Sequence, residues 1–467
     1  MAHWLRDRGY SAYAVRGGVA ALTGEGLDIV EAGDRPPPRF SRTLAALRHR
    51  DFRRFSVGVL FSLIGSWAEA AAFGYVVLLL GGSAATLGVI GFLNTIPNLL
   101  FALPGGALAD RFDRRKLLLA YQASNMAVAV LLAVLWATDS LTLGRLGVLA
   151  VAGGTLGTLS FPAFQGMLAS TVPAPDLESA VALNSLSLQI ARFVGPALAG
   201  FLLAAGGPAW VFGANAASFL AVIAALFLVA RTPPTRRAAG RASGALGEAF
   251  RFVFGQRSLS ALIVLMLLAG LFATPPVVFM IPALVRFNLD AGASTLGTLL
   301  AVVGLGSLLG SIALLRLSQR PNKGEPMIVA YVGTALAIAA IGASTSLPLS
   351  LVLGFVGGFG GVIFVGLSTV VVQTTTPDEL RARTMAIWAA SFIGMLPFGA
   401  LLTAGLAAWL GPGAAVFVDG LAVLIGAAVV LALRPQVLWL GCAALPESCI
   451  AATDPAAVAY EEEAQRA

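Results

Sequence analysis

The sequence is poor in charge, and this shortage excludes most soluble folds. Only 11% of its 467 residues are Asp, Glu, Lys or Arg, whereas 58% are hydrophobic. Soluble domains carry about 25% charged residues. A large soluble core is the alternative, but it does not explain repeated apolar runs of about 20 residues, the length that spans a bilayer. The composition therefore indicates a polytopic membrane protein.

The residues from which metal and catalytic sites are usually built are also scarce. The only histidines, His3 and His49, precede the first apolar run, and the only cysteines, Cys442 and Cys449, follow the last one. Chemistry within a membrane usually needs a cluster of His, Cys or carboxylate side chains. The phosphate-binding pattern GxxxxGK[ST] is missing as well. We therefore expect no enzyme, no ATP hydrolysis and no metal, and we expect the cysteines to be free thiols.

What the sequence does contain is apolar runs, which fall into two sets of six. A window of about 19 residues places the first set near 55–80, 84–109, 115–138, 146–170, 179–205 and 209–230. The second set lies near 259–284, 293–317, 326–346, 348–372, 384–410 and 413–433. We expect an all-α membrane protein with an N-terminal cytoplasmic segment (1–50), a six-helix bundle (51–231), a cytoplasmic linker (232–258), a second six-helix bundle (259–434) and a cytoplasmic tail (435–467).

Arginine predicts the orientation of these spans. Basic residues concentrate in the N-terminal segment, in the loop after the second span, in the linker and in later loops of the same parity. The opposite loops hold only Arg145 and Arg286. Because cytoplasmic loops carry such an excess of Lys and Arg, we expect both termini and the linker in the cytoplasm. The net charge of +7 then reflects topology and not nucleic-acid binding.

The two halves share features at an offset of 204 residues. Pro173 matches Pro377, Gly207-Pro208 matches Gly411-Pro412, and Asn215 matches Asp419. Parallel repeats around a central path are typical of transporters. Chance alone also produces a few such matches, so the repeat is supporting evidence only.

Two charged residues lie deep within apolar runs. Glu69 stands near the middle of the first run, and Arg192 is the only basic residue deep in a span. An ionised side chain at this depth costs about 2.5 kcal/mol or more, so Glu69 must stay protonated, face a wet cavity or meet a cation. Asn184 and Arg192 are eight residues apart and share one helical face. Asp419 lies a short way inside the last run, where we expect it to be solvated or to cap its helix.

The segment GGALADRFDRRK, residues 105–116, resembles the signature G-x-L-A-D-R-x-G-R-R of the major facilitator superfamily. Asp113 stands where that signature has glycine, and the likeness covers about residues 50–434. In the superfamily this loop helps to latch the two halves on the cytoplasmic side. A plain positive-inside loop would explain the arginines but not the acid or the glycines. The resemblance implies a cytoplasmic gate made by Gly106, Asp110, Arg111, Arg114 and Arg115, with Arg381 and Arg383 close by at the start of span eleven.

A second stretch, residues 182–220, is similar to the exporter branch that includes enterobactin exporters and macrolide efflux proteins, the transmembrane secretion effector type. Gly195-Pro196-x-x-x-Gly200 also resembles the antiporter signature of proton-coupled drug exporters, with its last glycines shifted. Proline removes a backbone hydrogen bond and glycine admits a neighbouring helix, so we expect this span to bend here. The residues that carry the likeness are Asn184, Arg192, Gly195, Pro196, Gly200 and Asn215.

In the superfamily, spans one and five lie close to a central cavity, so the resemblance implies that Glu69 and Arg192 share it with Asn184. We expect Glu69 to exchange protons. The alternatives are a permanently protonated packing residue, a fixed ion pair with Arg192, and a substrate contact without coupling. Aromatic side chains in the spans either line the substrate path or pack against other helices and lipid. The ones we expect along the path are Phe161, Phe164, Phe272, Trp388 and Phe392.

The expected function is secondary active export of a small amphipathic or hydrophobic compound, such as a drug, macrolide or siderophore. Proton antiport would drive it by alternating access, with the proton gradient in place of a cofactor. A lipid or lysolipid flippase of the same fold and a non-transporting membrane sensor or scaffold are the alternatives. The expected partners are the substrate and membrane lipid, without nucleic acid, for a monomer in the bacterial inner membrane.

Overall fold

Helices long and apolar enough to cross a membrane make up most of the protein. The computed structural model describes residues 44–229 and 246–440, apart from the side chains of 102–104, 106, 107, 109–111, 246 and 378. Within these ranges every regular element is helical, and twelve helices qualify as membrane spans by length and composition. The predicted twelve-span, all-α architecture is confirmed. His3, Cys442 and Cys449 lie outside the described residues.

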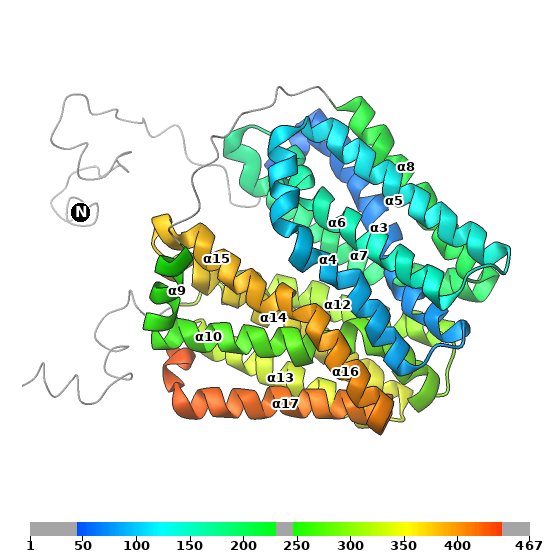
Figure 1. Cartoon of the computed structure of the whole chain (residues 1–467). Coiled ribbons are helices and arrows are strands. Elements are labelled where there is room, and N and C mark those ends of the chain that lie inside the picture. Colours follow the sequence, from blue (N-terminus) through cyan, green and yellow to red (C-terminus); the bar gives the residue numbers. More distant parts are fainter. Residues whose placement is uncertain (1–43, 230–245, 441–467) are drawn as a thin grey trace, which may run out of the picture.

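The first six spans form one bundle (Figure 1). A short 3-10 helix, η2 (Ala45–Arg48), precedes them, and another, η3 (Ala174–Asp176), leads into the fifth. The spans are α3 (Arg50–Leu79), α4 (Ala84–Arg111), α5 (Arg114–Ala137), α6 (Leu143–Ser170), α7 (Leu177–Gly206) and α8 (Pro208–Leu228).

The second bundle follows a helix that the sequence did not predict, α9 (Leu246–Gly255), within the expected linker. Its first span, Arg257–Asn288, combines α10 (Arg257–Leu268), η4 (Ala269–Ala273), η5 (Pro276–Met280), α11 (Ile281–Ala283) and η6 (Leu284–Asn288). The others are α12 (Ala293–Leu317), α13 (Gly324–Ala343), α14 (Leu347–Thr375), α15 (Asp378–Phe392) continued by η7 (Ile393–Met395) and α16 (Leu396–Leu410), and α17 (Pro412–Leu433), before the 3-10 helix η8 (Pro435–Trp439).

The matched glycine–proline pairs build the same local structure in both bundles. Gly207 ends α7 with a φ of 75°, and Gly411 ends α16 with a φ of 84°. Glycine adopts this left-handed conformation without steric cost. The proline that follows occupies the first turn of α8 or α17, where no backbone donor is needed. The two halves therefore repeat one helix–turn–helix joint.

The first span of the second bundle departs from regular α-helix. Its segments η4, η5 and η6 are π-helical, and Pro275, Pro276 and Pro282 fall between or within them. Proline cannot donate to the helical ladder and its ring displaces the preceding carbonyl. π-helical turns are one way in which a helix accommodates such a disturbance.

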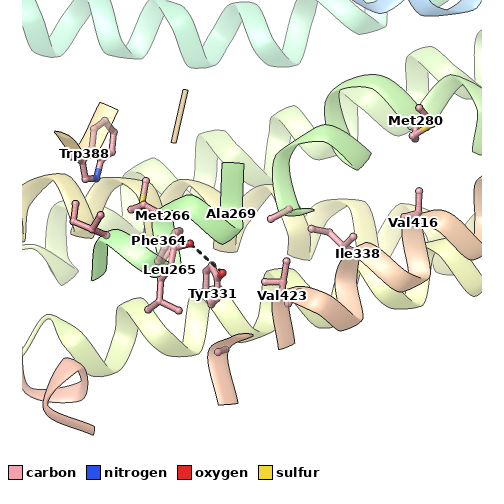
Figure 2. Packing of buried hydrophobic residues seen from close by; sticks show 14 of the residues in the cluster. Leu265, Met266, Ala269, Met280, Tyr331, Ile338, Phe364, Trp388, Val416 and Val423 are labelled. Carbon is pink, nitrogen blue, oxygen red and sulfur yellow. Dashed lines mark hydrogen bonds between the residues drawn. The ribbon is translucent and has the colours of Figure 1, made fainter. Parts of the chain in front are cut away.

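A dense apolar cluster joins the helices of the second bundle (Figure 2). Tyr331 of α13 is fully buried, and its ring lies 4.4 Å from that of Phe364 on α14. The Tyr331 hydroxyl donates to the backbone oxygen of Leu265 on α10, at 3.2 Å. The only polar group of this aromatic pair is therefore satisfied inside the bundle.

The two bundles contact each other mainly through α4 with α16 and α7 with α12. We call the end of the bundles where α8 stops and α10 starts the linker end, and the opposite end the far end. Gly200 of α7 and Gly297 of α12 face each other near the far end, and a Cβ on Gly200 would lie 2.8 Å from the Gly297 Cα. At the same end Gly88 of α4 touches Ala404 of α16. Small residues thus close the seam between the bundles at the far end.

Candidate transport site

Glu69 is the twentieth of the thirty residues of α3, and its carboxyl group is directed at α8. The side-chain amide of Asn215 donates from Nδ2 to Glu69 Oε2 at 2.7 Å. Asn215 is 1% exposed, and its Oδ1 lies 3.1 Å from the Ser218 hydroxyl. The same hydroxyl lies 2.7 Å from the Asn215 backbone oxygen, the closer acceptor for its single proton. Asn215 therefore presents its amide NH₂ to the Glu69 carboxyl group from a buried position on α8.

Gly65 makes this contact sterically possible. It precedes Glu69 by four residues and so lies on the same face of α3. A Cβ on Gly65 would lie 2.7 Å from Asn215 Oδ1 and would also collide with Ser218. The absence of a side chain at Gly65 allows α8 to approach α3 closely enough for the hydrogen bond. The sequence contained this signal, a glycine one turn before the buried acid, but did not reveal the partner.

Arg192 lies at mid-length of α7 and is not the partner of Glu69. Its guanidinium carbon lies 4.9 Å from the ring centroid of Trp67 on α3. Trp67 and Glu69 are two residues apart on one helix and so point to different neighbours. Within the described part of the chain, Arg192 forms no ion pair, and its buried Nε has no hydrogen-bond partner. The two charges expected to share a cavity thus occupy neighbouring but separate positions.

The polar and bending residues of α7 have distinct surroundings. Asn184 is half-buried, two turns nearer the linker end than Arg192. The helix continues unbroken through Pro196. A Cβ on Gly195 would lie 2.6 Å from the Trp67 Cβ, and Gly200 meets α12. Gly195 and Gly200 therefore let α7 approach α3 on one side and the second bundle on the other.

Asp419 corrects an expectation. It is 0% exposed, and the Thr403 hydroxyl of α16 donates to its Oδ2 at 2.6 Å. The prediction that it would be solvated or would cap its helix is wrong. Asp419 is the eighth residue of α17, about 10 Å from its start at 1.5 Å per residue. Helices α13 and α16 pack against α17, so the side chain is enclosed by neighbours that the sequence alone did not place.

The predicted aromatic residues of the first bundle differ in exposure. Phe161 of α6 is 62% exposed. Phe164 packs its ring 5.7 Å from that of Phe55, against an apolar cluster inside the bundle. Phe161 is accessible to a substrate or to lipid, whereas Phe164 contributes to packing. Their contact with a substrate stays a prediction.

The aromatic residues of the second bundle cluster around α15. Trp388 is 9% exposed, and its Nε1 donates to the Ser368 hydroxyl on α14 at 3.1 Å. The Phe392 ring lies 6.1 Å from that of Trp388. Phe272, in η4, is partly buried against the same core. Here too a role in lining the substrate path stays a prediction.

The signature loop between α4 and α5 is described in part. The side chains of Gly106, Asp110 and Arg111 lie outside the described residues, and the latch through Asp110 stays a prediction. Asp113, where the superfamily has glycine, caps α5 by accepting a hydrogen bond from the Lys116 backbone N–H at 2.8 Å. The departure from the signature thus has a local structural role.

The arginines predicted for the gate contact several elements. Arg114 packs against Gly166 of α6. Arg115 donates to the Phe227 carbonyl oxygen at 3.2 Å and lies over the Phe227 ring at the end of α8. Arg383 of α15 lies 3.9 Å from the Glu248 carboxylate of α9. The start of span eleven is therefore tied to the linker helix, a partner that the sequence did not suggest.

The sequence of the chain matches a known protein family and curated relatives. The family described as "Transmembrane secretion effector" matches residues 41–439. The enterobactin exporter EntS of Citrobacter koseri is 27% identical over 321 residues, which are 69% of this chain and 76% of that protein. EntS of Shigella flexneri is 26% identical over the same shares of the two chains.

Solved structures of transporters share the fold. The nucleoside transporter NupG aligns with a TM-score of 0.66 at 13% identity, over 82% of this chain and 99% of its own. The D-xylose–proton symporter aligns with a TM-score of 0.64 at 16% identity, over 82% and 98%. A bacterial homologue of the human lysosomal transporter Spinster, inward-facing and unoccupied, gives 0.60 at 14% identity, over 87% and 98%. With twelve spans, this fold and a family match over nearly all of the described residues, the chain belongs to the transmembrane secretion effector family of major facilitator transporters, which are not enzymes.

Proposed function

We propose that this transporter exports a small amphipathic or hydrophobic compound, such as a drug, macrolide or siderophore, in exchange for protons. The observation that carries the proposal is the environment of Glu69, whose carboxyl group is held by the neutral amide of Asn215 at 2.7 Å. No cation neutralises Glu69 within the described residues. A carboxyl group in such surroundings can take up and release a proton without breaking an ion pair. Intramembrane acids of this kind are typical of proton relays.

The seam between the bundles supports alternating access. Small residues bring α7 against α12 and α4 against α16 toward the far end, and α7 also touches α12 at mid-length, where Gly304 meets the Arg192 backbone. Arginine in the loops predicts that the linker end is cytoplasmic, so this conformation is closed toward the outside. Rocking of the bundles about the midpoint would open the far end. Residues inside the spans, such as Glu69 and Arg192, would then change their access from one side to the other.

The relatives support the direction and substrate class. The proteins named enterobactin exporters cover most of the span region at about 27% identity. Identity at this level leaves the side chains that shape a pocket free to differ. We therefore extend to this chain the export of an amphipathic compound and not a particular molecule.

Transport into everted membrane vesicles tests the proposal. Vesicles containing the protein would receive macrolides, dyes or siderophores with a proton gradient imposed, acidic inside. We expect at least one compound to accumulate, and accumulation to collapse when a protonophore removes the gradient. Vesicles without the protein control for passive partition. Movement of lysolipids without movement of any panel compound would instead indicate a flippase, and movement of neither would contradict transport.

A further inference from the structure

Arg192 is a cation without a counter-ion. It lies sixteen residues into the thirty-residue helix α7, near the middle of the membrane. Its Nε is buried without a hydrogen-bond partner, and no carboxylate of the described residues pairs with it. Removing a charge from water is costly unless it is paired and hydrogen-bonded. The described residues therefore leave an interaction of Arg192 unsatisfied.

Trp67 holds the guanidinium group but leaves its donors unused. The guanidinium carbon lies 4.9 Å from the ring centroid, within the range of a cation–π interaction. Within the described residues the contact leaves the buried Nε without a hydrogen-bond partner, although a guanidinium group carries five N–H donors. Gly195 lets α7 approach the Trp67 Cβ and the adjoining backbone of α3 closely. The pair is thus positioned by helix packing and does not depend on a bound anion.

Neighbouring polar side chains already have other partners. Glu69 faces α8 and receives the Asn215 amide. Gln189, one turn from Arg192, donates across the seam to the Ser307 backbone oxygen at 3.3 Å. On the side of the second bundle, Gly304 of α12 meets the backbone of Arg192 and brings no side chain. The surroundings of Arg192 therefore supply no anion from the described protein.

We propose that Arg192 and Trp67 form the binding site for the negatively charged group of the transported compound, which is an aromatic or amphipathic organic acid. Both side chains are only half-buried, so a ligand can reach them. A carboxylate suits the planar fork of arginine through paired charge-assisted hydrogen bonds, and the apolar body of the ligand would lie beside the indole. That the bound acid is also the transported compound rests on the proposed function, whereas binding of the acid can be tested by itself.

Binding of matched acids and amides to the purified protein in detergent tests this site. The probes are 2-naphthoate with 2-naphthamide and 1-pyrenebutyrate with its primary amide, titrated by calorimetry. We expect the wild type to bind at least one acid about tenfold or more tightly than its amide, the size of a charge-assisted hydrogen bond. Arg192→Gln should abolish that preference and leave amide binding unchanged. Arg192→Lys, which keeps the charge, should restore part of it.

Further variants separate recognition from folding. Trp67→Phe should weaken acid binding several-fold, because phenylalanine is a poorer cation–π partner than tryptophan. Asp419→Asn, an acid-to-amide change on α17 of the other bundle, should keep the preference for acids. All variants must elute as the wild type does in size-exclusion chromatography, and Arg192→Met replaces Arg192→Gln should the latter fail to fold.

Two binding results would each overturn the proposal, and so would one transport result. One is an acid-to-amide ratio in Arg192→Gln equal to that of the wild type, and the other is wild-type protein that prefers no acid of the series. Proton-driven transport of only neutral compounds would refute this site and leave export standing. A preference for acids that depends on Arg192, without transport in vesicles, would support the site while refuting export.

Discussion

Gly297→Ala should shift the protein away from the conformation described here. A Cβ at Gly297 would lie 2.9 Å from both the Gly200 backbone nitrogen and the Pro196 carbonyl oxygen, and closer still to the Gly200 Cα. These opposing atoms belong to backbone and cannot rotate away. Overpacking of this kind costs about 1–3 kcal/mol. If the bundles rock as we propose, the seam separates when the far end opens, and the cost falls only on the closed state.

This energy corresponds to a change of roughly five- to 150-fold in the ratio of closed to open protein. Double electron–electron resonance between spin labels can measure it, after replacement of Cys442 and Cys449. One label pair, at the exposed far-end residues Leu79 and Trp409, should show a longer distance population in Gly297→Ala. A second pair at the linker-end residues Lys116 and Gln373, also exposed, should show a shorter one.

Gly405→Ala is the matched control, because a Cβ at Gly405 of α16 would meet no atom within 4 Å. It should leave both distance distributions as in the wild type. Unchanged distributions in Gly297→Ala, or equal changes in both variants, would refute the idea that the glycine seam closes the far end.

Two further predictions concern stability, each read as the midpoint of thermal unfolding in detergent. In the wild type the Thr403 hydroxyl donates to Asp419 Oδ2 at 2.6 Å, and Asp419→Asn should keep most of the stability because its amide oxygen can still accept that bond. Asp419→Ala should lose about 1–3 kcal/mol, because it leaves the hydroxyl without a partner and opens a cavity. Equal midpoints for the two variants would contradict this contact. Asp113→Ala should lower the free energy of unfolding by about 1 kcal/mol, and Asp113→Gly by only about a few tenths of that, since glycine is a tolerated N-cap. A larger loss in Asp113→Gly than in Asp113→Ala would show that Asp113 does more than cap α5.

The spans were predictable because each depends only on its own residues. An apolar run of about 20 residues must cross the bilayer as a helix, whatever its neighbours are. The expected run near 293–317 matches α12 (Ala293–Leu317) in full. The π-helical turns of Arg257–Asn288 were not predicted, because periodicity in a wholly apolar run does not distinguish α-helix from π-helix.

The partners of the buried charges were not predictable, because they come from contacts far apart in sequence. Glu69 and Asn215 are 146 residues apart, and hydropathy carries no information on which helices adjoin. The same reason explains Asp419. Its position near the start of the last span predicted contact with water, but the neighbouring helices α13 and α16 exclude water from its side chain. Nothing in the sequence distinguished Trp67 from the other aromatic residues of the spans, because its contact with Arg192 depends on how α7 packs against α3.

The central claim is that Glu69 carries the coupled proton, and Glu69→Gln in sealed proteoliposomes tests it directly. Glutamine keeps the size of the side chain and an oxygen for the Asn215 amide, but it cannot exchange a proton. We expect counterflow of labelled for unlabelled substrate at the wild-type rate, and a loss of uphill transport driven by a pH gradient. Asp419→Asn, the same acid-to-amide change elsewhere, should retain both activities. Proton-driven transport by Glu69→Gln at the wild-type rate would contradict the account.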